Sequence, residues 1–143
     1  MERKALYIFD DIFNLIPKIL KTSKKCVNLA LSTFEHDVKR RKIERNSLNE
    51  IINLIQGKWS IDIIYTIRVL GESHYNDLKK ALKGISSRLL TDRLIMLVDK
   101  KILKRNVYET TPIRVSYVLT EFGENLFHLM VPIFVFWLSK TLD

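Results

Sequence analysis

The sequence predicts a mainly helical protein with one small β-hairpin, on three observations. Apolar residues make up 47% of the 143 residues, enough for a core, and they recur at helical spacing over most of the chain. The segments 102–108 and 115–119 are instead rich in β-branched and aromatic residues, as strands are. Lys and Arg number 24 against 16 Asp and Glu, and this net charge of +8 favours a polyanionic partner.

The first 46 residues predict two amphipathic helices. Pairs of apolar residues recur over residues 5–20, and Pro17 is expected to kink or end that helix. A second helix is expected to start near Ser23 and to run into the basic residues 39–42. Because this segment has no evident core of its own, we expect it to pack on the rest of the chain or on a second copy.

Four shorter helices are expected next. Ser47 is predicted to cap a helix over 48–56, which Gly57 ends, and a second helix is predicted over 59–70. A turn and a short helix over 75–82 follow. Ser86 is then predicted to cap a helix that runs to about residue 100, with Leu90, Leu94 and Leu97 as its core stripe.

The chain then changes from helical to strand periodicity. The two strand segments flank the polar loop 109–114, and Thr120 is predicted to cap a final long helix to about residue 140. Helices followed by a two-stranded wing are the winged helix-turn-helix arrangement. The predicted fold class is therefore mainly α with a small β-hairpin wing (α+β), a winged helix-turn-helix domain flanked by N- and C-terminal dimerisation helices.

Several short motifs occur in a fixed order across this region. The order is Gly57-Lys58-Trp59, Tyr75-Asn76-Asp77-Leu78, Gly84-Ile85-Ser86, Leu90-Thr91, Arg93-Leu94, Leu97, Arg105, Tyr108, Pro112, Tyr117-Val118-Leu119-Thr120 and Gly123. In this series the chain resembles the HxlR-type winged-helix transcription regulators, relatives of the MarR group, over roughly residues 47–138. The resemblance implies a homodimeric regulator that binds operator DNA.

Three features depart from the resembled pattern. The N-terminal 46 residues are longer than the short arm usual in such regulators. Many of them place a redox-sensing cysteine just before the Gly-Lys-Trp motif, whereas Cys26 lies far upstream among apolar residues and is predicted to be small and buried. Lys101 stands where they often have glycine, and Ile95 and Met96 where they often have polar residues.

The helix over about 86–100 is the predicted recognition helix, because a helix fits the major groove and its first residues reach the bases. Arg88 projects opposite the core stripe and can bind guanine with two hydrogen bonds. Asp92 can accept from cytosine, pair with Arg88 or repel phosphate. In the alternative interpretation Ser86 is only a cap and Arg88 only a solvated charge. The candidate residues are Ser86, Ser87, Arg88, Thr91, Asp92 and Arg93.

The hairpin over about 104–114 is predicted to contact the DNA backbone or the minor groove. An ordinary solvated hairpin is the alternative. The basic residues 39–42 are a further candidate for flanking phosphates, although such a run is more often a solvated helix face. The wing candidates are Lys104, Arg105, Thr110, Thr111 and Arg114, and Lys58 is the candidate backbone contact outside the wing.

The final helix is apolar on nearly all sides and must therefore be covered. We expect it to form a two-fold interface with the helix over 6–20. The alternative is that the N-terminal helices cover it within one chain. A two-fold dimer places its recognition helices about 34 Å apart and prefers a pseudo-palindromic operator. The expected interface residues are Leu6, Phe9, Phe13, Leu126, Met130, Ile133, Phe134 and Trp137.

No catalytic residue, metal ligand or cofactor is predicted. His36, His74 and His128 are scattered, and the sequence has no G-x-S-x-G, H-E-x-x-H or P-loop pattern. The most apolar stretch, residues 126–138, is shorter than the roughly 20 residues of a membrane span. With no secretory signal at the N-terminus, a cytoplasmic protein outside the membrane is expected.

Two functions remain after these exclusions. The first is a sequence-specific regulator that binds double-stranded DNA. The second is a winged-helix protein–protein interaction module with only non-specific DNA affinity, which Asp92, Ile95 and Met96 keep open. The predicted domains are the N-terminal extension 1–46, the DNA-binding domain 47–120 and the dimerisation helix 121–143. The sequence leaves a small-molecule effector open.

Overall fold

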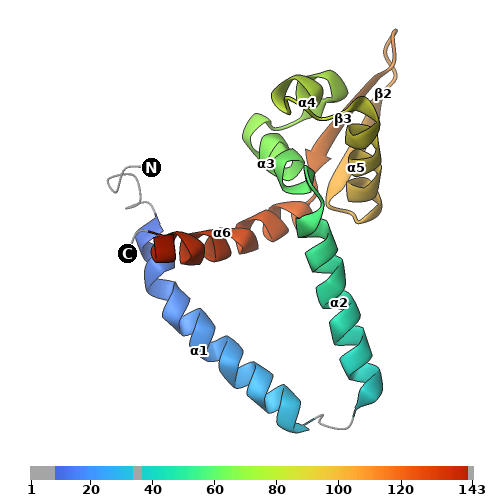
Figure 1. The fold of residues 1–143 in the computed structure, drawn as a ribbon. Helices are drawn as coiled ribbons and strands as arrows, with labels where there is room; N and C mark the ends of the chain where they lie inside the picture. The colour runs from blue at the N-terminus through green and yellow to red at the C-terminus, as the bar shows by residue number, and fades with distance from the viewer. Residues whose placement is uncertain (1–8, 34–36, 142–143) are drawn as a thin grey trace. The chain divides into compact units, whose positions relative to one another are not determined.

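The computed structural model describes residues 9–33 and 37–141, which form six helices and three strands (Figure 1). The chain divides into two units, one of residues 1–48 with 128–143 and one of residues 49–127. The elements in order are α1 (Asp10–Thr33), α2 (Val38–Gln56), α3 (Ser60–Leu70), β1 (Ser73–His74), α4 (Tyr75–Ala81), α5 (Ser87–Asp99), β2 (Leu103–Tyr108), β3 (Arg114–Leu119) and α6 (Glu121–Thr141).

The second unit has the winged-helix core that the periodicity predicts. Figure 1 shows α3, α4 and α5 gathered beside the hairpin of β2 and β3. Leu90, Leu94 and Leu97 are at most 1% exposed, which confirms the predicted stripe of α5. They pack in one cluster with buried residues of the other elements, among them Leu54, Ile63, Ile64, Ile67, Leu78, Leu82, Ile85, Ile102 and Leu103.

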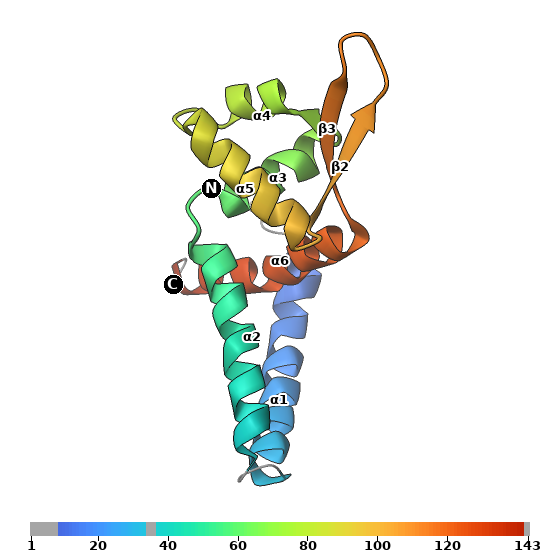
Figure 2. The same ribbon diagram turned by 90° about the vertical axis from the view of Figure 1, so that its right-hand side faces the viewer.

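The sheet has three antiparallel strands in the order β1-β3-β2. The ladder of β2 and β3 runs from the pair Leu103 and Leu119 to the pair Tyr108 and Arg114. Beyond it, residues 109–113 are exposed, and the hairpin reaches past α4 and α5 (Figure 2). The two predicted strands are confirmed to within a residue. Strand β1 was not predicted, because two residues are too few for a strand pattern.

Two predicted caps are confirmed. The Ser86 hydroxyl accepts a hydrogen bond from the Leu89 amide at 3.1 Å at the start of α5. The Thr120 hydroxyl accepts from the Gly123 amide at 3.0 Å at the start of α6. The Thr120 amide also donates to the Ile102 carbonyl at 3.0 Å, so the first turn of α6 is joined to the turn that follows α5.

Of the predicted helix boundaries before residue 57, the end at Gln56 is confirmed and the others are wrong. Helix α1 continues through Pro17 to Thr33, since its apolar spacing persists and a helix can tolerate one lost backbone bond. Helix α2 begins at Val38, where the Asp37 carboxylate accepts from the Arg40 amide at 2.9 Å. Ser47 is therefore an interior residue of α2 rather than a cap, and the predicted domain boundary at 46/47 falls inside this helix.

In the first unit, the end of α6 meets the start of α1. The rings of Phe9 and Phe134 lie edge to face with centroids 6.3 Å apart, and Val135 is fully buried. Other apolar side chains of α6 are open, with Leu129 70% and Trp137 69% exposed. This contact agrees in part with the alternative expectation, in which the N-terminal helices cover the final helix within one chain. Much of α6 is nevertheless uncovered.

Within the described residues, one helix is long and apolar enough to cross a membrane. The segment Glu121–Lys140 of α6 has a mean hydropathy of 1.3, and 11% of this window is buried. Residues 126–138 alone are too short for a membrane span, but the helix that contains them is not.

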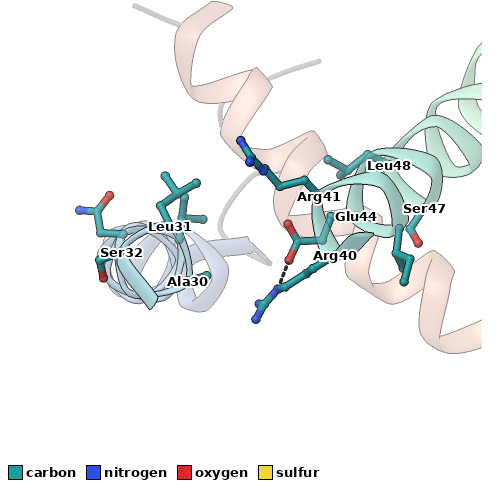
Figure 3. A pocket seen from close by; sticks show the side chains of 11 residues that line it. Ala30, Leu31, Ser32, Arg40, Arg41, Glu44, Ser47 and Leu48 are labelled. Carbon is teal, nitrogen blue, oxygen red and sulfur yellow. Dashed lines mark hydrogen bonds and ion pairs between the residues drawn. The ribbon is translucent and has the colours of Figure 1, made fainter. Parts of the chain in front are cut away.

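Helix α1 has no buried residue, and Cys26 on it is exposed, so the prediction that Cys26 is buried is wrong. The second half of α1 and the first half of α2 enclose an open groove of about 1010 Å³ (Figure 3). Apolar side chains such as Leu31 and Leu48 line it beside the Arg40–Glu44 ion pair of 2.7 Å. The first unit thus carries apolar surface at both ends of α1.

Candidate nucleic-acid interface

The carbonyl of Ser87 at the start of α5 accepts one hydrogen bond from α4 and one from within α5. The Tyr75 hydroxyl donates to the Ser87 carbonyl at 3.0 Å, and the Thr91 hydroxyl donates to the same carbonyl at 3.0 Å. The Tyr75 bond thus joins the first turn of α5 to α4, and the Ser86 cap and the Thr91 bond stabilise that turn itself. Ser86, Ser87 and Thr91 are all exposed there.

Arg88 and Asp92 lie on the outward face of α5. Their side chains are 94% and 63% exposed, and Nε of Arg88 lies 4.0 Å from Oδ2 of Asp92. An exposed pair at this distance contributes about 1 kcal/mol or less, so another partner can displace Asp92 from the guanidinium. The structure contains the Arg88–Asp92 contact that was one of the three roles considered for Asp92.

Arg93 lies apart from these residues. It is half-buried, and its Nε is buried with no hydrogen-bond partner among the residues that the structure describes. A Cβ added at Gly57 would lie 2.9 Å from Nη1 of Arg93 and 2.8 Å from Oγ of Ser60. The guanidinium therefore packs against the start of α3 instead of the outward face that carries Arg88.

The strand register separates the wing candidates into two groups. Lys104 and Arg105 pair with Val118 and Tyr117, at the end of the hairpin away from the loop. Thr110, Thr111 and Arg114 lie at the loop end. All five are exposed, but the loop end of the wing carries one of the three basic residues.

Glu72, which precedes β1, links the body to both strands of the wing. Its carboxylate accepts hydrogen bonds from the hydroxyls of Ser116 and Tyr108. The Ser116 bond, followed by the Tyr108 bond, lowers the pKa of Glu72 below its ordinary value of 4.5. The bond to Glu72 raises the pKa of Tyr108. The ring of His74 also contacts the Val115 carbonyl, at 2.7 Å from Nδ1.

Two exposed residues near the wing were not among the predicted contacts. Asn76 and Lys80 on α4 line an open hollow of about 500 Å³ together with Arg114 of β3. The basic residues Lys79 and Lys80 were a visible signal in the sequence, but only the fold places Lys80 beside the wing. Lys58 is exposed, with its Nζ 5.4 Å from the centre of the Trp59 ring.

The expected dimer residues are divided between the units. Leu126 is half-buried and packs against the winged-helix core, so it has a structural contact within the chain. Ile133 and Trp137 are 66% and 69% exposed. Phe134 is 48% exposed beside Phe9, and Phe13 and Met130 are half-buried. Leu6 lies outside the described residues, as does His36.

In the described part of the chain, no group of three or more His, Cys, Asp or Glu side chains is placed to hold a metal ion. The chemistry of this surface is that of hydrogen-bond donors and cations around one exposed helix N-terminus. A helix N-terminus with free N–H groups favours anionic oxygens.

Comparison with known proteins gives one consistent family. A family model described as HxlR-like helix-turn-helix matches residues 54–143. The regulatory protein MalR of Fusobacterium mortiferum is 29% identical over 94 residues, which are 66% of this chain and 89% of MalR. The HTH-type transcriptional regulator YdeP of Bacillus subtilis is 35% identical over 75 residues, 52% of this chain and 58% of YdeP.

A solved structure supports the fold. The MarR-family transcriptional regulator of Enterococcus faecalis V583 superposes with a TM-score of 0.64 at 28% identity, covering 68% of this chain and 88% of that one. The compared proteins are named as regulators rather than enzymes. The first 53 residues, with α1 and most of α2, precede the region that the family model matches.

Proposed function

Because the chain belongs to the HxlR-like helix-turn-helix family of transcription regulators, we propose that it binds a specific operator in double-stranded DNA as a homodimer. The observation that carries this proposal is the outward face of α5. Arg88 is 94% exposed there, in the first turn after the Ser86 cap, and the wing loop extends from the same unit. A major groove accepts such a helix, and guanine accepts two hydrogen bonds from an arginine.

The proposed roles of the side chains follow from their placement. Arg88 reads base edges, with Asp92 orienting it or accepting from cytosine. Ser86, Ser87 and Thr91 contact phosphates beside the helix, and Thr110, Thr111 and Arg114 contact the backbone or minor groove at the wing loop. Lys58, Lys104 and Arg105 are proposed to contact the phosphate backbone of the DNA. Arg93 is assigned to packing instead, because its guanidinium lies against α3.

A homodimer is supported by the apolar surface of the first unit. The exposed side chains of α6 and the uncovered faces of α1 need a cover in water. A second copy supplies an identical and therefore self-complementary face. Its two recognition helices then read half-sites about 34 Å apart, which makes a pseudo-palindromic operator the expected target. A cytoplasmic location is part of the same proposal.

The test is DNA binding by fluorescence anisotropy, with operators first selected from genomic fragments and with excess unrelated DNA as competitor. The Arg88→Ala variant is expected to weaken operator binding by about 1–3 kcal/mol and to leave binding to unrelated DNA nearly unchanged. The matched control is Lys18→Ala, which removes the same charge from the exposed surface of α1. Equal losses for Arg88→Ala and Lys18→Ala on both DNAs would leave only the net charge as the cause.

A second candidate function is favoured by one observation. Ile95 on α5 is 56% exposed, and an open apolar side chain suits a protein partner better than a phosphate backbone. Met96 gives no such support, because it is half-buried and packs against the core. If fragment selection enriches no DNA and Ile95→Ser abolishes capture of a partner protein, the interaction-module function replaces the regulator.

A further inference from the structure

The wing of this protein has few links to its body near the loop. Strand β1 pairs with β3 at Ser73 with Tyr117 and at His74 with Ser116, and the backbone pairing with the body ends there. The hairpin continues for two more paired positions, to Tyr108 and Arg114, and then into the exposed loop. The outer part of the wing therefore depends on side chains for its attachment.

Glu72 attaches Tyr108 on β2 and also holds Ser116 on β3, while Nδ1 of His74 contacts the Val115 carbonyl on β3. Its Oε1 accepts the hydroxyl of Tyr108, in the last ladder pair before the loop, and the hydroxyl of the fully buried Ser116 on β3. Glu72 itself is anchored, since the neighbouring Gly71 donates its amide to the Ile67 carbonyl of α3 at 2.8 Å. The path thus runs from the buried Ile67 of α3 to the edge of the wing loop.

The negative charge of Glu72 would by itself disfavour DNA binding beside the wing. A carboxylate beside a surface that meets DNA repels phosphates, and the same hollow contains Thr110 and Arg114 of the wing. A role inside the protein accounts for its presence. Two hydroxyl donors bind the ionised form, and such charge-assisted bonds are stronger than neutral ones.

We propose that Glu72 is a positioning residue that fixes the wing loop relative to the start of α5 before DNA binds. The role rests on the proposed function, because a fixed wing position affects binding only if the wing contacts DNA. Glu72 touches no base or phosphate in this role. It acts through Tyr108 and Ser116, so the three side chains form one unit.

This role has a signature that a purely electrostatic one lacks. Glu72→Gln removes a negative charge and is expected to strengthen binding to unrelated DNA, while operator binding weakens because the wing is loosened. The ratio of operator to unrelated affinity is expected to fall about five- to tenfold, because the Gln amide leaves a neutral acceptor where the carboxylate forms stronger, charge-assisted hydrogen bonds. Tyr108→Phe and Ser116→Ala remove a donor without changing the charge, and they are expected to lower the same ratio.

The matched control is Glu109→Gln on the same hairpin. Glu109 is exposed and has no side-chain partner in the described residues, so its loss changes the charge alone. It is expected to raise both affinities alike. A double variant of Glu72→Ala with Tyr108→Phe is expected to lose less than the sum of the single losses, since both act on one contact. Equal ratios for Glu72→Gln and Glu109→Gln, or full additivity, would overturn the proposal.

The position of the wing is also measured without DNA, which separates this inference from the proposed function. Spin labels at Thr111→Cys and Lys83→Cys, in a Cys26→Ser background, report the distance from the wing loop to the end of α4. The distribution is expected to broaden or shift in Glu72→Ala and to stay unchanged in Glu109→Gln. Unchanged distributions in both would overturn the positioning role. If the wild type binds no operator while the distance distribution of Glu72→Ala is broadened, the proposed function is overturned and the positioning role of Glu72 is not.

Discussion

At the scale of single residues, Lys101 carries an avoidable strain. It follows α5 with a φ of 58°, and its amide donates to the Val98 carbonyl at 2.9 Å while the Ile102 amide donates to the Leu97 carbonyl at 2.9 Å. This pair of bonds is the Schellman motif, in which the left-handed residue is most often glycine. The position is the one where the resembled regulators often have glycine.

Lys101→Gly is therefore expected to raise the free energy of unfolding by about 0.5–1 kcal/mol. The left-handed conformation costs an L-residue about 1–2 kcal/mol, and the added entropy of glycine in the unfolded chain returns part of that. Denaturant titration measures the gain. Lys100→Gly is the control, because Lys100 has an ordinary φ of −77° and glycine there is expected to destabilise. A lower free energy of unfolding in Lys101→Gly would contradict a strained backbone at Lys101.

For single residues of the candidate site, the sequence predicts a position on the helix surface but not burial by a distant segment. Periodicity correctly placed Arg88 on the outward face of α5, since the core stripe of Leu90 and Leu94 fixes the helix rotation. Arg93 was assigned to that site by its type and position in the helix alone. Its burial depends on Gly57, 36 residues earlier, which leaves space for the guanidinium beside Ser60. Such contacts need the tertiary fold.

At the scale of elements, the winged-helix region was predictable because its caps and turns lie where its periodicity changes. Ser86, Thr120 and the two long strands illustrate this. The N-terminal helices were not, since Pro17 predicts a kink or an end, whereas the helix continues through it along its apolar face. Asp37 went unnoticed as the cap of α2 among the surrounding charges. Strand β1 exists only through its pairing with β3.

The joint between α6 and the turn after α5 tolerates no side chain at Gly123. A Cβ there would lie 2.2 Å from the Ile102 carbonyl oxygen and 3.1 Å from Leu119. Gly123→Ala is expected to destabilise the protein by about 1–3 kcal/mol or more, because backbone must move to admit the methyl group. Thermal unfolding measures the loss. Asn125→Ala, at an exposed position of the same helix, is expected to change little.

The bond between Glu72 and the wing predicts a pH dependence of stability. Since folding lowers the pKa of Glu72, its contribution is present above the ordinary value of 4.5 and is lost as the pH falls through the folded value. Wild type is expected to exceed Glu72→Gln in unfolding free energy at pH 6–7, and the difference is expected to shrink under acid. A difference that stays constant from pH 7 to pH 3 would show that ionisation of Glu72 does not contribute.

At the scale of the whole molecule, basic side chains are sparse in the C-terminal segment, where large apolar side chains are exposed. Residues 114–143 contain 2 of the 24 basic side chains, and α6 in this segment exposes large apolar ones. The remaining basic residues accompany the N-terminal helices and the winged unit. A molecule of this composition can bind a polyanion with one part while another part binds an apolar partner, which on symmetry grounds is a second copy.

The outer face of α6 provides the test of that dimer. Ile133 is 66% exposed, so Ile133→Lys is expected to leave the helical content unchanged while a lysine at the interface disrupts association. The dissociation constant of the dimer, measured by sedimentation velocity, is expected to rise at least about tenfold, since burying an isoleucine contributes about 1.5–3 kcal/mol. Operator affinity is expected to fall with it, because a monomer offers one recognition helix.

Asn125→Lys is the control for this experiment, because it adds the same charge to α6 within the winged-helix unit. It is expected to leave the dissociation constant unchanged. A wild-type chain that stays monomeric at about 10 µM would contradict the dimer, because protein interfaces of standard size have dissociation constants of about 1 µM or lower. Recovery of wild type with membranes, lost in Ile133→Lys, would assign the exposed face of α6 to lipid instead, in keeping with its length and hydropathy.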